Sequence, residues 1–399
     1  MKTKNLKKKL AAMAMSIIMA CSVVGGITAS ATKTIDFDCG VTDKPIWGDN
    51  RYETSLQAAF EVYKQTSTKY STVIIASGLS YADALSASYL SVQKNAPILF
   101  TSVNNNTADT NLKKFLGRYA YDNCQVFIIG GTGVISDTTE KMLKTAQNYS
   151  VTRLAGSDRY TTNRYILDKT NAKNADKILI CDGTNFPDAL SASATQYPIM
   201  LASKNGLTEA QKNYLKTTKK NFVIIGGTGA VTTTVESQLK SISSNVSRIA
   251  GSNRYETCQK VATQLISTNP TKWTIVSGSA FPDALSGSYV ARKNGTPLIL
   301  AQETTAQETT YNHSSGSSNS SENHSTGYSK TILNFDMLNK YYSSLSNKVQ
   351  GEIYIGSTAS EAFHYYVEKH PSVSCGISEE LWSGGGHNIG YSSVSSMNN

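Results

Sequence analysis

The sequence predicts an α/β protein made of three tandem modules, each with a parallel β-sheet covered by helices. Two observations predict this fold class. A Gly-x-[Asn/Asp]-Arg-Tyr block occurs at Arg51, Arg159 and Arg254, so its copies lie 108 and 95 residues apart. These periods are domain-sized and too long for a solenoid repeat. Within each copy, short apolar segments alternate with amphipathic ones, which is typical of parallel strands buried between helices.

The first 31 residues are predicted to form a cleaved signal peptide. A lysine-rich start precedes the apolar stretch 10–24, and Ala29-Ser30-Ala31 matches the cleavage pattern. Segment 18–21 loosely resembles a lipoprotein processing site, but Met19 fits poorly there, so lipidation of Cys21 is the less favoured alternative. No later apolar run reaches the ~20 residues that a membrane span requires. We therefore expect a secreted protein without a transmembrane segment.

The charge balance argues against nucleic acid as a partner. The formal net charge of the 399-residue chain is +9, and removing the five leader lysines leaves +4. This mildly basic chain lacks the dense basic stripe of nucleic-acid-binding proteins. It still favours an acidic polymer over a basic one.

Cysteine and histidine usage predicts neither a disulfide framework nor a metal site. The cysteines after the leader are odd in number and scattered, namely Cys39, Cys124, Cys181, Cys258 and Cys375. A single disulfide among them is left open. The histidines all lie late in the chain, namely His313, His324, His364, His370 and His387, and none has zinc-ligand spacing. Cys375 and His387 are close only in sequence, so we predict no catalytic residue and no metal ligand.

The first strand and helix of each module are predicted from a second repeated segment. Its copies are an apolar run, a glycine and an Asp-Ala-Leu-Ser sequence, at 73–88, 178–193 and 274–288. Short apolar runs that end at glycine are typical of buried strands. The aspartates, Asp83, Asp188 and Asp283, favour the positive end of a helix. We expect them to cap these helices, because no second acid recurs beside them in all three copies, as acid–base catalysis would need.

A second strand follows Pro97, Pro198 and Pro297, and a third strand enters a glycine-rich turn at 126–136 and 222–232. Capping-box patterns after these turns predict helices. Backbone N–H groups at such a turn can hold a phosphate, which makes Gly131, Thr132, Gly227 and Thr228 candidate ligand contacts. A plain βα turn that requires positive φ is the favoured alternative. Neither G-x-G-x-x-G nor Walker spacing occurs, so no nucleotide cofactor is expected.

The third copy departs from this pattern. Its only candidate for the third strand is 353–355, which precedes Gly356. Gly356 follows Pro297 by 59 residues, whereas the corresponding glycine follows the corresponding proline by 33 and 28 residues in the first two copies. The Ser/Asn-rich segment 302–330 fills most of the excess, and its low complexity predicts a disordered loop. We favour a third module split by this insertion, with an amphipathic helix at 338–345. The alternative is a linker followed by a separate C-terminal domain.

These motifs resemble the type 2 cell-wall-binding repeat of Gram-positive, mainly clostridial, surface proteins. The resemblance covers Trp47 to Val367. It implies Toprim- or Rossmann-like modules packed as a pseudo-threefold unit within one monomer. It also implies noncovalent anchoring at the cell surface through an anionic wall polymer. We place the repeats at 47–149, 150–247 and 248–370, followed by a tail at 371–399 of unknown role.

The repeated Arg-Tyr pairs are the best candidates for contact with such a polymer. They are Arg51 and Tyr52, Arg159 and Tyr160, and Arg254 and Tyr255. A guanidinium group matches a phosphate or carboxylate with two parallel hydrogen bonds, and a tyrosine ring can pack on a sugar. The structural alternative is that each arginine pairs with the aspartate of its own module or lies at a module interface.

The sequence thus predicts a secreted wall-anchoring protein that binds multivalently and performs no catalysis. One alternative is a cell-wall hydrolase of the N-acetylmuramoyl-L-alanine amidase type, or its modifier subunit, since such repeats often accompany amidases. Another is a minor surface-layer protein. A catalytic domain would distinguish the hydrolase, and no such domain is recognisable in the sequence.

Overall fold

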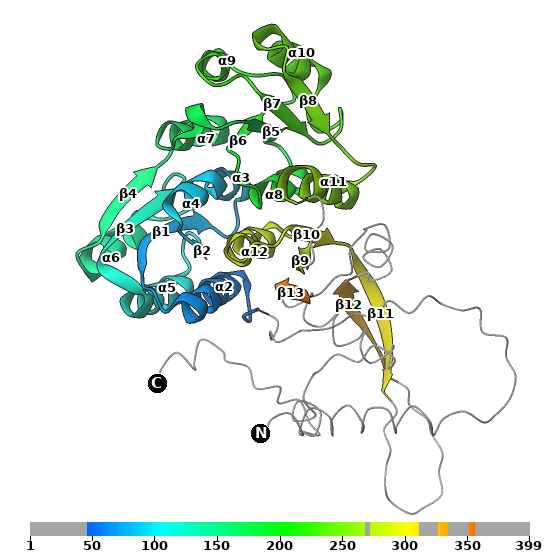
Figure 1. The fold of residues 1–399 in the computed structure, drawn as a ribbon. Helices are drawn as coiled ribbons and strands as arrows, with labels where there is room; N and C mark the ends of the chain where they lie inside the picture. Colours follow the sequence, from blue (N-terminus) through cyan, green and yellow to red (C-terminus); the bar gives the residue numbers. More distant parts are fainter. Residues whose placement is uncertain (1–45, 268–271, 311–325, 334–350, 356–399) are drawn as a thin grey trace, which may run out of the picture. The chain divides into compact units, whose positions relative to one another are not determined.

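A computed structural model describes residues 46–267, 272–310, 326–333 and 351–355 (Figure 1). Several sequence predictions lie outside these residues: the signal peptide, Cys39, Cys375, all five histidines, the helix at 338–345, the turn after Gly356 and the tail. Within the described residues, the α/β class with parallel sheets and three repeated segments is confirmed.

The first module contains one four-stranded sheet, in the order β2-β1-β3-β4, with every pairing parallel. Its elements are α2 (Arg51–Thr66), β1 (Tyr70–Ser77), α3 (Tyr81–Ser86), α4 (Ser88–Lys94), β2 (Ile98–Thr101), α5 (Asn106–Tyr119), β3 (Ala120–Ile129), α6 (Asp137–Ala146) and β4 (Ser150–Leu154).

The second module repeats this topology with the strand order β6-β5-β7-β8, again parallel throughout. Its elements are α7 (Arg159–Asp168), the 3-10 helix η1 (Ala172–Asn174), β5 (Ile178–Asp182), α8 (Pro187–Ser193), β6 (Ile199–Ala202), α9 (Glu209–Lys216), β7 (Phe222–Ile225), α10 (Thr233–Ile242) and β8 (Val246–Ile249).

The third module has a described parallel sheet in the order β10-β9-β13. Its elements are α11 (Arg254–Val261), the π-helix η2 (Ala262–Ile266), β9 (Lys272–Ser277), α12 (Phe281–Asn294), β10 (Leu298–Ala301), β11 (Glu303–Thr310), β12 (Thr326–Leu333) and β13 (Gly351–Ile355).

Strand β13 lies beyond the insertion yet pairs with β9 of the third module. Ile353 is in register with Thr274, and Ile355 with Val276. Ile355 also forms a parallel bridge with Ile46. A split third module requires this pairing, whereas a separate C-terminal domain does not. The repeat boundaries themselves stay predictions.

The insertion differs from the disordered loop that its composition predicts. Strands β11 and β12 pair antiparallel without a register shift, from Glu303 opposite Leu333 to Thr310 opposite Thr326. The expectation of disorder is therefore wrong for these two stretches. Threonine is β-branched and favours extended backbone, and β11 contains four threonines in Glu303–Thr310. The low complexity of the whole segment gave no indication of this local preference for extended backbone.

Sequence reasoning missed two kinds of element, a helix in all three modules and a strand in the first two. One is the helix that begins at the repeated arginine, which is α2, α7 or α11. The other is the fourth strand, β4 or β8, which is short and only partly apolar. β4 pairs with β3 and β8 with β7, so these strands complete the sheet of the preceding module. The boundaries predicted after residues 149 and 247 assign all of β4 and half of β8 to the following repeat.

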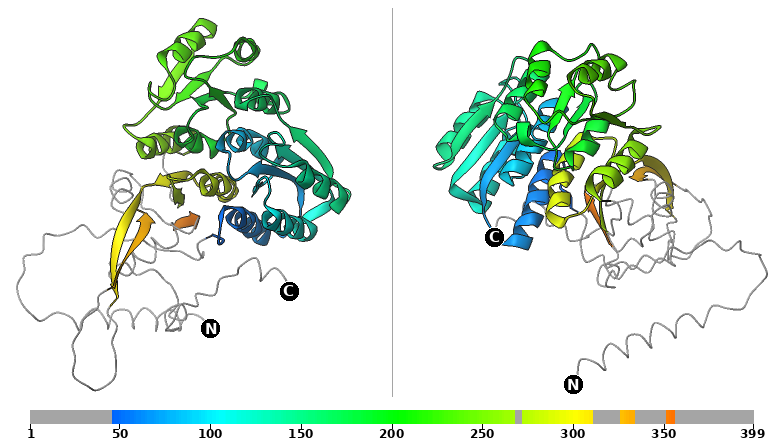
Figure 2. Two further views of the ribbon diagram at one scale, coloured as in Figure 1. Left: turned by 180° about the vertical axis from the view of Figure 1, so that it is seen from behind. Right: turned by 45° about the horizontal axis from the view of Figure 1, so that its top comes forward.

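Contacts between modules run from each module to the next and from the third back to the first. Helix α3 contacts α7, α8 contacts α11, and α12 contacts α2. The α12–α2 pair lies side by side in Figures 1 and 2. A cyclic arrangement of the modules requires these contacts. The pseudo-threefold packing and the Toprim- or Rossmann-like label remain predictions.

Candidate functional site

The repeated Gly-x-[Asn/Asp]-Arg-Tyr block begins a helix in each module. The residue before each arginine is the helix N-cap, and its side chain accepts hydrogen bonds from backbone N–H groups of the first turn, as the side chain of Asn50 does from Tyr52 and Glu53. The backbone N–H of the glycine donates to a threonine hydroxyl six residues later, from Gly48 to Thr54 and likewise in the other copies. Most of the block is therefore explained by helix capping.

Each repeated arginine is anchored to its own module by a glycine carbonyl. The Nη1 atoms of Arg51, Arg159 and Arg254 donate to the carbonyl oxygens of Gly78, Gly183 and Gly278, at 2.8, 2.7 and 2.9 Å. These glycines directly follow the first strands β1, β5 and β9. The guanidinium groups therefore lie at the carboxyl ends of the sheets, where ligands commonly bind in open α/β folds. Arg51 is exposed, whereas Arg159 and Arg254 are partly buried.

The repeated tyrosines pack on the same glycines. A Cβ atom at Gly78, Gly183 or Gly278 would lie 2.8, 2.6 or 2.6 Å from the ring of the tyrosine in the same module. Tyr52 also donates a hydrogen bond from its hydroxyl to Ser102 Oγ at 2.9 Å. Tyr52, Tyr160 and Tyr255 therefore have a packing role within their modules, which leaves less of each ring for a sugar.

The arginine that interacts electrostatically with each of the three aspartates belongs to the next module. Burial raises the pKa of Asp83, and the charge of Arg159 and a hydrogen bond from Thr162 oppose that rise. Burial raises the pKa of Asp188 in the same way, with Thr257 and Arg254 opposing it. The idea that each arginine pairs with the aspartate of its own module is wrong, because Arg159 and Arg254 interact with the aspartates of the preceding modules. The interface alternative describes the arrangement.

The same interaction between an aspartate and an arginine occurs between the third module and the first. Burial raises the pKa of Asp283 to about 6, Arg51 lowers it and Glu303 raises it. The aspartates lie in the first turns of α3, α8 and α12 as predicted, but the N-cap residues Ser80, Phe186 and Ala280 make no side-chain cap bond. The capping role of these carboxyl groups stays a prediction.

The glycine-rich turns have the backbone that the sequence predicts. Gly130 and Gly226 have φ angles of +100° and +108°, in the left-handed region that glycine tolerates. Their carbonyl oxygens accept hydrogen bonds from Arg153 at 2.9 Å and from Arg248 at 2.7 Å. Each of these arginines also pairs with a glutamate of the helix that follows the turn.

A carboxyl group already lies against each turn. Asp83 Oδ2 is 2.7 Å from the position of a Cβ atom on Gly130, and Asp188 lies against Gly226 in the same way. A phosphate at the turn would meet this carboxyl group, which disfavours the phosphate-cradle interpretation. Thr132 and Thr228 are exposed beside the turns.

An aromatic cluster joins the three modules and was missed in the sequence. Tyr81, Phe186 and Phe281 stand two residues before the three aspartates, and their ring centroids lie 5.6, 6.3 and 6.2 Å apart. The Tyr81 hydroxyl donates to the carbonyl oxygen of Thr184 at 2.5 Å and accepts from Arg159 Nη1 at 3.0 Å. The recurrence of an aromatic residue at this position was the available signal.

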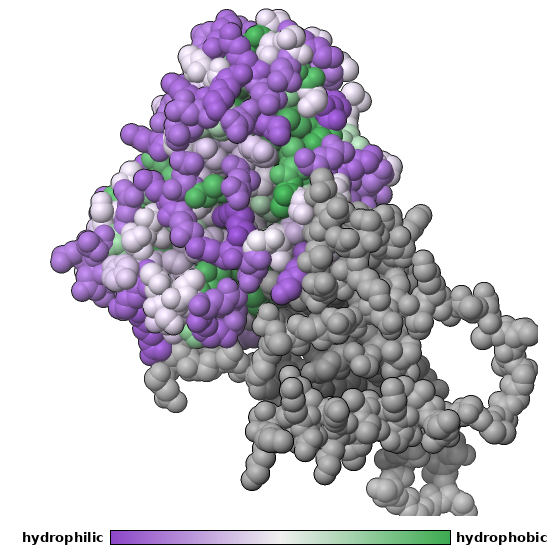
Figure 3. Space-filling view, in the orientation of Figure 1, coloured by the Kyte–Doolittle hydropathy of each residue, from purple (hydrophilic) through white to green (hydrophobic). Residues whose placement is uncertain are grey.

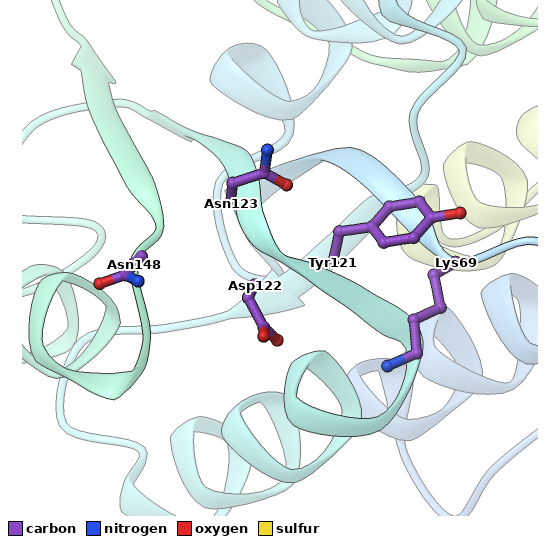
Figure 4. A pocket seen from close by; sticks show the side chains of 5 residues that line it. All are labelled: Lys69, Tyr121, Asp122, Asn123 and Asn148. Carbon is purple, nitrogen blue, oxygen red and sulfur yellow. The ribbon is translucent and has the colours of Figure 1, made fainter.

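A surface hollow of about 430 Å³ lies elsewhere in the first module (Figure 4). It is lined by Lys69, Tyr121, Asp122, Asn123 and Asn148, and these residues flank the amino ends of β1, β3 and β4. It therefore lies away from the repeated arginines, which are at the carboxyl ends of the strands. None of its residues belongs to a repeated motif.

The described residues give no sign of a nucleophilic or metal-dependent centre. Cys124, Cys181 and Cys258 are buried and unpaired, and burial raises the pKa of the Cys258 thiol to about 11. In the described ranges, no group of three or more His, Cys, Asp or Glu side chains is placed to hold a metal ion. No described helix has the length and apolar character to span a membrane. The face of the described surface in Figure 3 is largely hydrophilic, with separate hydrophobic areas.

Comparison with curated proteins finds two relatives from Bacillus subtilis (strain 168). The chain is 33% identical to N-acetylmuramoyl-L-alanine amidase LytC over 262 residues, which is 64% of this chain and 50% of LytC. It is 32% identical to a protein named amidase enhancer over 270 residues, which is 66% of this chain and 35% of the enhancer. The chain thus spans half or less of the length of these relatives.

Solved structures share the fold. Cwp8 from Clostridium difficile matches with a TM-score of 0.64 and 22% identity, covering 83% of this chain and 52% of Cwp8. Cwp6 from the same organism matches with a TM-score of 0.62 and 24% identity, covering 79% of this chain and 45% of Cwp6.

A family model described as cell wall binding domain 2 (CWB2) matches three tandem segments, at residues 46–140, 153–236 and 248–358. The third segment spans the insertion and includes β13. The resemblance inferred from the repeated motifs is therefore confirmed. The chain belongs to the cell wall binding domain 2 family and is a secreted protein of the cell wall.

Proposed function

We propose that this protein anchors itself noncovalently to the Gram-positive envelope by binding an anionic wall polymer at its module interfaces. The observation that carries the proposal is the placement of a guanidinium group at the carboxyl end of the first strand in each module. Each guanidinium uses Nη1 to bind a glycine carbonyl. A guanidinium has five N–H donors, so donors remain for a phosphate or carboxylate.

Three linked interfaces suit a polymer with repeated charges. If the modules pack with pseudo-threefold symmetry, the polymer crosses Arg51, Arg159 and Arg254 in turn. Each contact is weak alone, but the second and third become intramolecular once the first has formed. Thr132 and Thr228, which are exposed beside the turns, can add hydroxyl contacts, together with the backbone of Gly131 and Gly227. The edges of Tyr52, Tyr160 and Tyr255 that do not touch glycine can add contacts with sugar rings.

The test is binding of the purified protein to isolated cell walls. Intact walls should retain it, and walls extracted to remove their anionic polymer should retain much less. Retention on intact walls should also fall as salt is raised, because salt screens contacts between exposed charges. Equal retention on intact and extracted walls would refute the proposal.

A second candidate function is suggested by the relatives. They are named as an amidase and an amidase enhancer. This chain would then act as the wall-targeting part of a hydrolase, or as its modifier. We propose that the chain itself is not an enzyme. Zymography on gels containing cell walls tests this point, and a cleared band at the position of the purified protein would overturn it.

A further inference from the structure

The surface hollow of the first module is built at an irregularity in the sheet. Where β1 pairs with β3, the single residue Ser71 of β1 stands opposite the four residues 121–124 of β3. Such a bulge changes the direction of the side chains beside it. In a regular strand, successive side chains alternate between the two faces of the sheet. Here three consecutive side chains, those of Tyr121, Asp122 and Asn123, line the same hollow.

The second module lacks this bulge. Its strands β5 and β7 pair without a register shift. The last buried residues of α5 and α9 are Leu116 and Leu215. Gly130 follows Leu116 by 14 residues, whereas Gly226 follows Leu215 by 11. This difference of three residues equals the excess of β3 over β1 in the bulge. The additional residues are therefore not needed to form the sheet of a module.

The hollow combines exposed side chains with a fixed backbone. All five lining side chains are exposed, and that of Tyr121 is 45% exposed. Four residues next to them in the chain are buried, namely Tyr70, Ala120, Cys124 and Tyr149. The Tyr70 hydroxyl also donates to the carbonyl oxygen of Ala59 at 2.6 Å. Because the backbone is held by these buried neighbours, less freedom is lost when a ligand binds.

The lining side chains offer one aromatic ring among groups that form hydrogen bonds. Lys69 and Tyr121 lie at one side of the hollow and Asn148 at the other, with Asp122 and Asn123 between them (Figure 4). Each carboxamide group offers both donors and an acceptor. The two charged side chains have opposite signs, so the hollow selects neither an anion nor a cation. Sites for apolar ligands are lined mainly by apolar side chains, which disfavours a lipid.

We infer that this hollow binds an uncharged glycan that contains N-acetyl groups. The Tyr121 ring offers an apolar face to the C–H groups of a sugar ring. Sugar hydroxyl groups both donate and accept hydrogen bonds, which suits the Asp122 carboxylate and the Lys69 ammonium group. The carboxamides of Asn123 and Asn148 can pair with an acetamido group through N–H and C=O together.

This site is separate from the one in the proposed function. The repeated arginines lie at the carboxyl ends of the strands, whereas the hollow lies at the amino ends of β1, β3 and β4. The two sites also suit different ligands, an anionic polymer and an uncharged glycan. A protein with both sites would contact two components of the wall.

The test is calorimetric titration of the full chain with chitotetraose, the uncharged tetramer of N-acetylglucosamine. The unmodified protein should bind it saturably, and Tyr121→Ala should weaken binding about tenfold, as loss of an aromatic anchor does. Tyr165→Ala is the matched control, because Tyr165 is 48% exposed on α7 of the second module, outside the hollow. The control should bind like the unmodified protein. Absence of saturable binding, or equal affinities of Tyr121→Ala and Tyr165→Ala, would overturn the inference.

Two further measurements test the N-acetyl group. Asn148→Ala should weaken the binding of chitotetraose about threefold, which is the effect of one neutral hydrogen bond. Cellotetraose has hydroxyl groups in place of the N-acetyl groups and should bind the unmodified protein more weakly. Equal affinity for the two tetrasaccharides would overturn the assignment to N-acetylated sugars.

Circular dichroism and urea unfolding show whether each variant is folded. Should Tyr121→Ala not fold, Asn148→Ala decides, and an affinity equal to that of the unmodified protein would overturn the inference. A failure of chitotetraose to bind leaves the proposed anchoring intact, because retention on intact and extracted walls tests the anionic polymer separately.

Discussion

The pH dependence of stability tests the contact between the third and first modules. Burial raises the pKa of the Asp283 carboxyl to about 6, with Arg51 opposing the rise and Glu303 adding to it. In an unfolded chain the pKa of aspartate is about 3.9. The folded state therefore binds this proton more tightly than the unfolded state. Ionisation of Asp283 costs stability, and two pKa units correspond to roughly 3 kcal/mol as an upper limit.

The sign of the effect follows from the raised pKa. The cost is absent below about pH 4, where both states are protonated, and it is complete above the folded pKa of about 6. Asp283→Asn removes the titration, so its unfolding free energy should fall less between these pH values than that of the unmodified protein. The attraction to Arg51 exists only while Asp283 is ionised, so it is already included in the folded pKa of about 6.

Urea unfolding of the full chain at a series of pH values measures the difference. Asp137→Asn serves as the control, because Asp137 is exposed on α6. The control should follow the pH profile of the unmodified protein, while Asp283→Asn departs from it by up to roughly 3 kcal/mol. Parallel profiles for Asp283→Asn and the unmodified protein would refute the reasoning.

Three further substitutions test the local contacts by urea unfolding. Asn253→Ala removes a helix cap and should cost ~1 kcal/mol, whereas Asn253→Asp, the residue type of the second module, should cost little; equal losses would argue against capping. Gly183→Ala places a Cβ atom against the Tyr160 ring and should cost ~1–3 kcal/mol, while Gly131→Ala, with nothing within 4 Å of its Cβ, should be tolerated. Arg153→Gln breaks the bonds of Arg153 to a turn carbonyl and a glutamate and should cost ~1–3 kcal/mol. An unchanged free energy of unfolding would contradict a structural role for Arg153.

Sequence reasoning predicted the buried strands well because their signal is local. The apolar runs before Gly78, Gly183 and Gly278 are strands, and the apolar residues before Gly130 and Gly226 end strands β3 and β7. Continuous apolar character over a few residues is enough for such a prediction. The fourth strands lack that signal, since Ser150–Leu154 and Val246–Ile249 each contain an arginine and a serine. Pairing with the finished sheet makes these segments extended.

The partners of the repeated aspartates could not be predicted in the same way. Asp83 and Arg159 are 76 residues apart, and Asp188 and Arg254 are 66 apart. Within one module, the aspartate and arginine are nearer in sequence, so a local argument favours the wrong pair. The order in which modules contact one another decides the partner, and the pattern of a single module contains no information on that order.

The repeated block illustrates why triplication alone does not identify a ligand contact. Within the first module, Asn50 caps its helix, Arg51 donates to a glycine carbonyl and Tyr52 packs on the same glycine. Any copy of the module needs these contacts in order to fold, whether or not it binds a ligand. The positions that differ between copies are more informative about binding. Ser77 and Asp182 accept the corresponding turn hydrogen bond in their modules, but only Asp182 has a carboxyl group, so a functional difference between modules is best sought at such positions.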